Sequence, residues 1–109
     1  FDESEPANDE AAAFIKGFRE YLRAKKQDES IPAVSALGYD AYLAAIKAIE
    51  AADSTDPAAI RQALSSAVVE GATGTITFNE TGDANKNLAF IKVIRDGRFQ
   101  FLTTSTISR

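Results

Sequence analysis

In the first two-thirds of the chain, apolar residues recur every three or four positions, which predicts three amphipathic helices. The first covers about 9–26, and the second runs through the alanine-rich stretch after Pro32. Asp56 caps a third helix over about 57–67, and Pro57 fits its first turn. The first stripe consists of Ala11, Phe14, Ile15, Phe18 and Leu22, and the second of Tyr39, Tyr42, Leu43, Ile46 and Ile49.

After Gly71 the pattern changes to alternation with a period of two, which is typical of strands. Residues 75–78 alternate, and residues 88–95 are nearly continuous in apolar side chains, which predicts a strand buried on both faces. Asp96-Gly97 is a two-residue hairpin signal, and the chain returns through 98–102. Three helices followed by three strands make an α+β chain.

The domain organisation follows from these elements. We expect an acidic arm over 1–8, one structural segment over 9–103 (helical in 9–70, strands in 71–103) and a Ser/Thr-rich tail over 104–109. The chain begins without Met, so we expect it to be an excised or processed piece. Its strands carry more apolar surface than the short helices cover, and their edges are unprotected, so we expect other strands to complete the sheet.

Composition excludes several classes of function. The 109 residues carry 12 Lys+Arg and 16 Asp+Glu, a net charge of −4, and no His or Cys. Without His and Cys there is no Ser-His-Asp or Cys-His pair and no usual zinc site, so we expect no enzyme, metal or cofactor. The acidic balance also argues against nucleic-acid binding. One basic cluster is interpreted as a solvated helix face: Lys16, Arg19, Arg23, Lys25 and Lys26.

Two candidate sites remain in the loops. Residues 79–85 are rich in oxygen-bearing side chains but lack the closing Glu of a calcium loop, so a plain turn is expected. Residues 34–40 place small residues beside aromatic ones before a buried helix, an arrangement that can bring backbone and hydroxyl groups to a ligand. Taken alone, the residues favour ordinary core packing there.

An ordered set of motifs resembles the C-terminal third of the periplasmic branched-chain amino-acid-binding proteins, the type I solute-binding proteins of ABC importers. The resemblance covers about residues 10–103. The motifs are Phe14-Ile15-Lys16-Gly17-Phe18, Ala36-Leu37-Gly38-Tyr39-Asp40-Ala41, Ser54-Thr55-Asp56-Pro57, the stretch 71–83, and Asp96-Gly97-Arg98-Phe99.

This resemblance implies an α/β clamp of two lobes that closes by a hinge around an amino acid and docks on a membrane permease. It implies an extracytoplasmic, periplasmic location. Most residues that hold the amino acid would lie outside this chain. The resemblance carries over only the loop before the Gly-Tyr-Asp motif, at Val34, Ser35 and Ala36.

Two other classes of function stay open. The same clamp serves ligand-sensing ectodomains and regulators, which signal instead of delivering a solute. A self-standing interaction module that dimerises through its exposed strands is the other alternative. On the main hypothesis, the chain by itself binds free amino acids poorly.

Overall fold

The computed structural model describes residues 1–107. Three helices precede the strands along the chain, which confirms the predicted α+β order. The elements are α1 (Asp9–Ala24), α2 (Ala33–Ala52), α3 (Pro57–Ser65), β1 (Val69–Gly71), β2 (Gly74–Phe78), β3 (Ala84–Asn85), β4 (Leu88–Arg95) and β5 (Arg98–Thr106).

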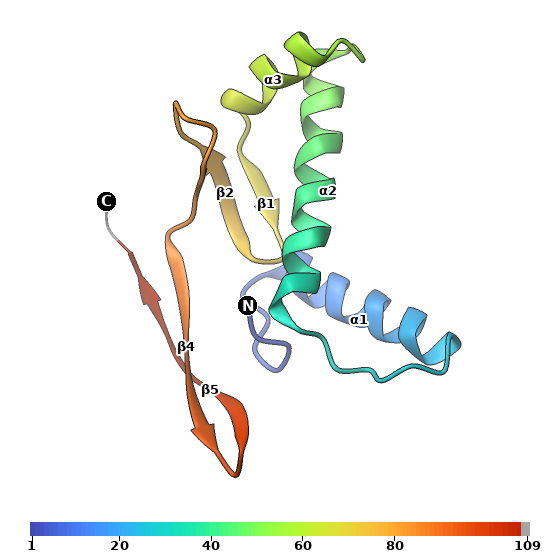
Figure 1. Ribbon diagram of the computed structural model, residues 1–109, viewed down its shortest axis with the longest axis vertical. Helices are drawn as coiled ribbons and strands as arrows, with labels where there is room; N and C mark the ends of the chain where they lie inside the picture. Colours follow the sequence, from blue (N-terminus) through green and yellow to red (C-terminus); the bar gives the residue numbers. More distant parts are fainter. Residues whose placement is uncertain (108–109) are drawn as a thin grey trace.

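The molecule is open and flat, with extents of 48 × 38 × 20 Å. Helix α2 forms its long axis, with α1 crossing near one end and α3 at the other (Figure 1). Strands β1 and β2 lie beside α2, whereas the β4–β5 hairpin extends away from the helices (Figure 1). The hairpin therefore lacks a second layer of structure over most of its length.

The helix ends follow from local capping. The Asn8 side chain accepts a hydrogen bond from the amide of Ala11 at 2.7 Å and so starts α1. Asp56 caps α3 in the same way, through Ala59 N at 3.1 Å. Helix α1 ends two residues before the predicted boundary, because Lys26 adopts a left-handed conformation with φ of 56° that a helix cannot continue through.

The strands form two separate sheets, one of order β1-β2-β3 and one of β4-β5, all antiparallel. Strands β1 and β3 were not predicted, because three and two residues are too short to show an alternating pattern. Strand β1 also begins at Val69, before the predicted change from helix to strand at 70/71.

Strand β5 continues to Thr106, into the stretch 104–109 that was expected to be a tail. Thr104, Ser105 and Thr106 pair with Phe90, Ala89 and Leu88. Threonine is β-branched and favoured in strands, so the Ser/Thr-rich composition suits an edge strand as well as a tail. Residues 108–109 of the predicted tail lie outside the described residues.

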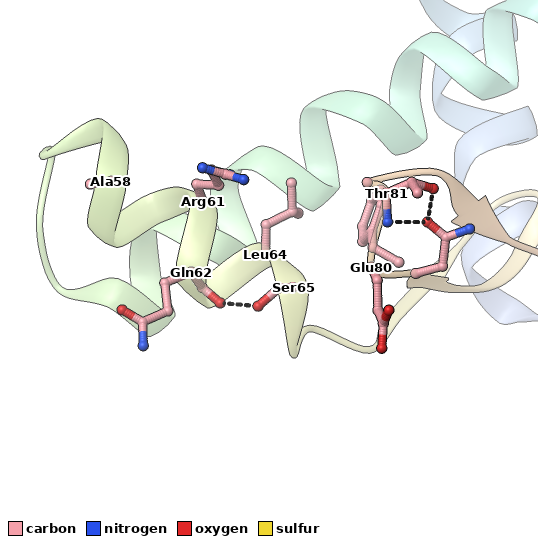
Figure 2. A pocket seen from close by; sticks show the side chains of 10 residues that line it. Ala58, Arg61, Gln62, Leu64, Ser65, Glu80 and Thr81 are labelled. Carbon is pink, nitrogen blue, oxygen red and sulfur yellow. Dashed lines mark hydrogen bonds between the residues drawn. The ribbon is translucent and has the colours of Figure 1, made fainter.

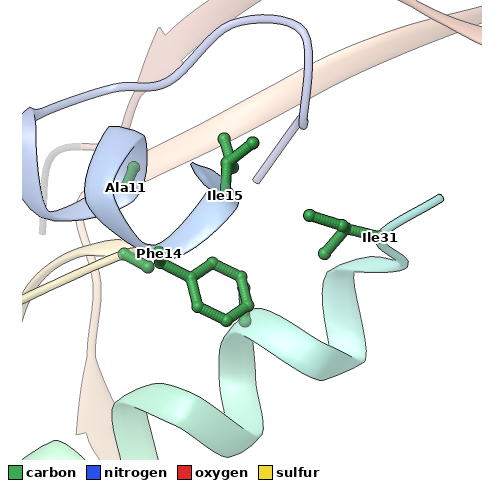
Figure 3. Packing of buried hydrophobic residues seen from close by; sticks show 6 residues of the cluster. Ala11, Phe14, Ile15 and Ile31 are labelled. Atoms are coloured by element: carbon green, nitrogen blue, oxygen red, sulfur yellow. The ribbon is translucent and has the colours of Figure 1, made fainter. Parts of the chain in front are cut away.

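Two small hydrophobic clusters replace a single core. One lies between α1 and the start of α2 and contains Ala11, Phe14, Ile15, Ile31, Ala36 and Ala72 (Figure 3). The second contains Ala44, Val69 and Ile76, where α2 meets the sheet of β1 and β2. Within residues 1–107, no helix combines the length and apolar character that crossing a membrane requires.

The expectation that β4 is buried on both faces is wrong. Ile94 and its cross-strand partner Phe99 are 68% and 76% exposed. The apolar sequence is that of a buried strand, but the chain supplies no layer to cover it. The apolar side chains of the hairpin are therefore uncovered within residues 1–107.

Candidate functional site

The residues expected to approach a ligand lie in the first turn of α2, not in a loop. The helix begins at Ala33, directly after Pro32, whose extended backbone forms the N-cap without a side-chain hydrogen bond. Val34 is 70% exposed and Ser35 is half-buried. Ala36 is fully buried in the first hydrophobic cluster, so its side chain packs against the core.

A pocket of about 480 Å³ lies beside this turn. Three parts of the chain line it: residues 2–5, residues 31–33 at the start of α2, and Lys92 with residues 99–101 of the β4–β5 hairpin. These parts are distant in the sequence and meet only in the fold. Val34, Ser35 and Ala36 follow directly after the α2 wall but do not line this pocket.

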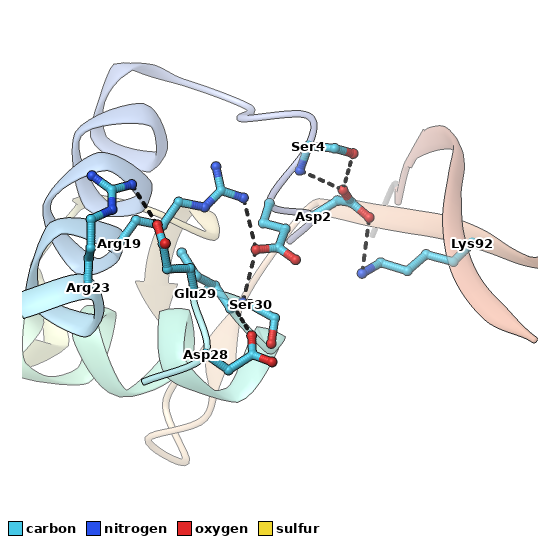
Figure 4. Close-up of polar contacts among 10 residues, drawn as sticks. Asp2, Ser4, Arg19, Arg23, Asp28, Glu29, Ser30 and Lys92 are labelled. Atoms are coloured by element: carbon cyan, nitrogen blue, oxygen red, sulfur yellow. Dashed lines mark hydrogen bonds and ion pairs between the residues drawn. The ribbon is translucent and has the colours of Figure 1, made fainter. Parts of the chain in front are cut away.

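The first wall begins with Asp2, which is only 7% exposed. Its Oδ1 accepts a hydrogen bond from Ser4 N at 2.9 Å, and its Oδ2 forms an ion pair with Lys92 Nζ at 3.2 Å (Figure 4). Burial alone would raise the pKa of Asp2, but the hydrogen bonds from Ser4 and Lys92 and the charge of Lys92 outweigh it and hold the pKa below its usual range.

Glu3 contacts the opposite wall. Its Oε2 accepts hydrogen bonds from Arg19 Nη2 at 3.0 Å and from the backbone amide of Ile31 at 2.9 Å. Asp2 and Glu3 both bind other parts of the molecule, so these two residues of the expected acidic arm over residues 1–8 are held against the fold. The run of acidic residues indicated a solvated segment. The basic side chains and the backbone amide that bind Asp2 and Glu3 come close to them only in the folded chain.

A second pocket, of about 390 Å³, separates α3 from the turn after β2 (Figure 2). Two of its polar side chains are hydrogen-bonded within their own segments: Ser65 Oγ donates to Gln62 O at 2.6 Å, and Asn79 Oδ1 accepts from Thr81 N at 3.0 Å. A plain turn was expected over residues 79–85, and the structure has it over 79–83, because residues 84–85 form β3 and pair with β2. The described part of the chain contains no cluster of acidic residues that could hold a metal ion.

A third pocket, about 440 Å³ in volume, is an apolar groove along α2, α3 and β2. Small side chains on α2, among them Ala41 and Ala45, form one side, and Ile60, Leu64 and Phe78 form the other. The groove lies away from the α2 start, and its lining has the character of a packing surface.

Known proteins resemble the chain in both sequence and structure. Residues 1–98 match a family described as periplasmic binding protein. A crystal structure of a leucine-binding protein from Thermotoga maritima is similar, with a TM-score of 0.75 and 28% sequence identity. That likeness covers 97% of this chain but only 29% of the leucine-binding protein. No curated protein matches the sequence.

The structural likeness confirms the fold class, since this α+β chain matches part of a type I periplasmic binding protein. The family consists of solute binders that are not enzymes, in agreement with the expectation drawn from the missing His and Cys. Because the family match spans residues 1–98 of 109, the chain belongs to the periplasmic binding protein family.

Proposed function

We propose that this chain forms about a third of a two-lobed, periplasmic protein that binds a branched-chain or similar amino acid and delivers it to an ABC importer. The observation that carries the proposal is the likeness to a leucine-binding protein over 97% of the chain. The exposed apolar residues of β4 and β5 support it, because a larger body would cover them.

The solute would bind where α2 begins. Val34 and Ser35 lie in the first turn of α2, where the positive end of the helix dipole favours a carboxylate. The exposed Val34 side chain suits contact with an aliphatic solute. Ala36 takes part only by fixing the turn against the hydrophobic cluster. Residues 9–103 act as one segment of the clamp, and the protein works by hinge closure on the solute followed by docking on the permease.

The test is isothermal titration calorimetry of the solute-binding protein that contains this chain, with leucine, isoleucine, valine and a set of polar amino acids. We expect micromolar binding of aliphatic amino acids, at least tenfold weaker binding in Val34→Asp, and an unchanged affinity in the control Val68→Asp. Val68 is 64% exposed and lies before β1, so it matches Val34 in exposure and chemistry.

Failure of the intact protein to bind any amino acid would contradict the proposed solute. Equal weakening by the two substitutions would contradict the proposed place of the site. The isolated 109 residues serve as a further control, since we expect them to show no measurable binding.

A second candidate function is self-association through the β4–β5 hairpin. Ile94, Phe99 and Leu102 are 68%, 76% and 52% exposed, and apolar edges of this kind pair readily with a second copy. Size-exclusion chromatography with light scattering tests it. A dimer that becomes a monomer in Phe99→Thr supports this candidate, and a monomeric wild-type chain contradicts it.

A further inference from the structure

Two consecutive carboxylates contact opposite walls of the pocket beside α2. Asp2 forms the 3.2 Å ion pair with Lys92 on β4. Glu3 Oε2 accepts a hydrogen bond from the amide of Ile31 at 2.9 Å. Ile31 lies three residues before the exposed Val34. Figure 4 shows Asp2 held between Ser4 and Lys92, on the side of the segment that faces the hairpin.

The backbone that joins these two carboxylates is itself held in a turn. Glu5 N donates to Asp2 O at 3.2 Å, and Ser4 N donates to Asp2 Oδ1 at 2.9 Å. The two bonds close residues 2–5 into a turn stabilised by the Asp2 side chain, which we call the Asp2–Glu5 turn. Because the turn is closed on itself, a displacement of Lys92 that carries Asp2 also carries Glu3.

The ion pair is well placed to transmit such a displacement. The Asp2 side chain is 9% exposed and that of Lys92 is 32% exposed, so water screens the pair less than it screens a surface pair. On the hairpin itself, Ile94 and Phe99 are exposed, and no packed layer fixes them. The contact between Lys92 and Asp2 is therefore one restraint on where the hairpin lies relative to α2.

We infer that the Asp2–Glu5 turn couples the position of the β4–β5 hairpin to the start of α2, and so positions Val34 and Ser35 for the solute. The part that concerns the solute rests on the proposed function. The mechanical part does not, because it depends only on contacts within this chain. Asp2 and Glu3 act here as positioning residues, through Lys92 on one side and Ile31 on the other.

Hydrogen exchange tests the mechanical part in the solute-free protein that contains this chain. In Lys92→Met the ion pair is lost, and we expect the amides of Ile31 and of residues 33–36 to exchange about fivefold faster, the equivalent of ~1 kcal/mol for one partly buried ion pair. Asp2→Asn, which keeps the shape and the acceptor for Ser4, should give the same change. Lys47→Met, at an exposed position of α2, is the matched control.

Amides of α3, which lies at the far end of α2, report general destabilisation, and their exchange should not change. Unchanged exchange at residues 31–36 in both variants would overturn the inference, as would an equal acceleration in α3. Calorimetry with leucine then separates the two proposals. If Lys92→Met speeds up the exchange but the protein binds no amino acid, the coupling is supported and the proposed function is contradicted. If Lys92→Met changes neither the affinity for leucine nor the exchange rate, the coupling is contradicted and the proposed function is not affected.

Discussion

The carboxylate of Asp40 on α2 accepts both the backbone amide and the hydroxyl of Thr73, at 2.8 and 2.5 Å. It also accepts a hydrogen bond from Ala72 N at 2.7 Å, and Asp40 is only 2% exposed. Lys86 Nζ donates to the same Thr73 hydroxyl at 2.7 Å. This contact joins the helix that carries the proposed solute contacts to the turn between β1 and β2, and it gives a structural reason for the aspartate of the Gly-Tyr-Asp motif.

The first prediction concerns this buried acceptor. Ala72 N and Thr73 N donate to different oxygens of Asp40, so the NH₂ group of Asp40→Asn would face one of these two backbone donors. We expect a loss of about 2–3 kcal/mol in the free energy of unfolding, since buried donors are left unsatisfied. Urea denaturation measures it. The control Asp9→Asn, at an exposed position in the first turn of α1, should cost no more than ~0.5 kcal/mol.

The second prediction contrasts two glycines. A Cβ at Gly71 would lie 2.6 Å from Cγ and both oxygens of the Asp40 side chain, so Gly71→Ala should destabilise the fold by about 1–3 kcal/mol. Gly17 lies within α1 with nothing within 4 Å, and Gly17→Ala should stabilise it by up to ~1 kcal/mol. Thermal melts of both variants are the measurement, and a shift of the same sign in each would contradict the assignment.

The third prediction separates two roles of Asn8. Its Oδ1 caps α1, and its Nδ2 donates to Gly71 O at 3.0 Å. Asn8→Ala loses both bonds, and we expect a cost of about 1–2 kcal/mol. Asn8→Asp keeps the cap and loses only the donor, so its unfolding midpoint in urea should fall between those of the wild type and Asn8→Ala. An aspartate variant less stable than the alanine variant would count against this division.

The fourth prediction concerns alkaline pH. The hydrogen bond that Tyr39 donates to Glu10, together with partial burial, raises the pKa of Tyr39 from 10.0 to about 12. Above the unfolded pKa the unfolded chain releases this proton while the folded chain keeps it, so stability falls as pH rises. Protonated Tyr39 thus stabilises the fold below pH 10, and this contribution is lost between pH 10 and about 12.

Urea midpoints across this pH range test the assignment. Tyr39→Phe should be less stable than the wild type near neutral pH and should lose less stability than the wild type at alkaline pH. Tyr42→Phe is the control, because Tyr42 is 69% exposed and its loss should leave the pH profile unchanged. The absence of any difference between the two variants would show that the bond to Glu10 has no such effect.

The limits of the sequence as a predictor are clearest at the N-terminus and at β4. Asp2 and Glu3 indicated a solvated arm, because nothing nearby in the sequence pairs with them, yet they bind Lys92, Arg19 and Ile31 in the fold. Strand β4 had the pattern of a doubly buried strand, whereas its burial depends on layers that these residues do not contain. The sequence was limited in the same way at the candidate site. It placed Val34 and Ser35 in a loop, and it did not predict two walls of the neighbouring pocket.

By itself, the sequence determined the order of the helices, their caps at Asn8 and Asp56, and the turn at Asp96-Gly97, because these depend on residues within a few positions of one another. Only the tertiary structure decided the contacts of Asp2 with Lys92 and of Asp40 with Thr73, which join residues 90 and 33 positions apart. A helix or a turn depends on free-energy differences between neighbouring residues. The partner of a charged side chain depends on which distant surfaces pack together and exclude water.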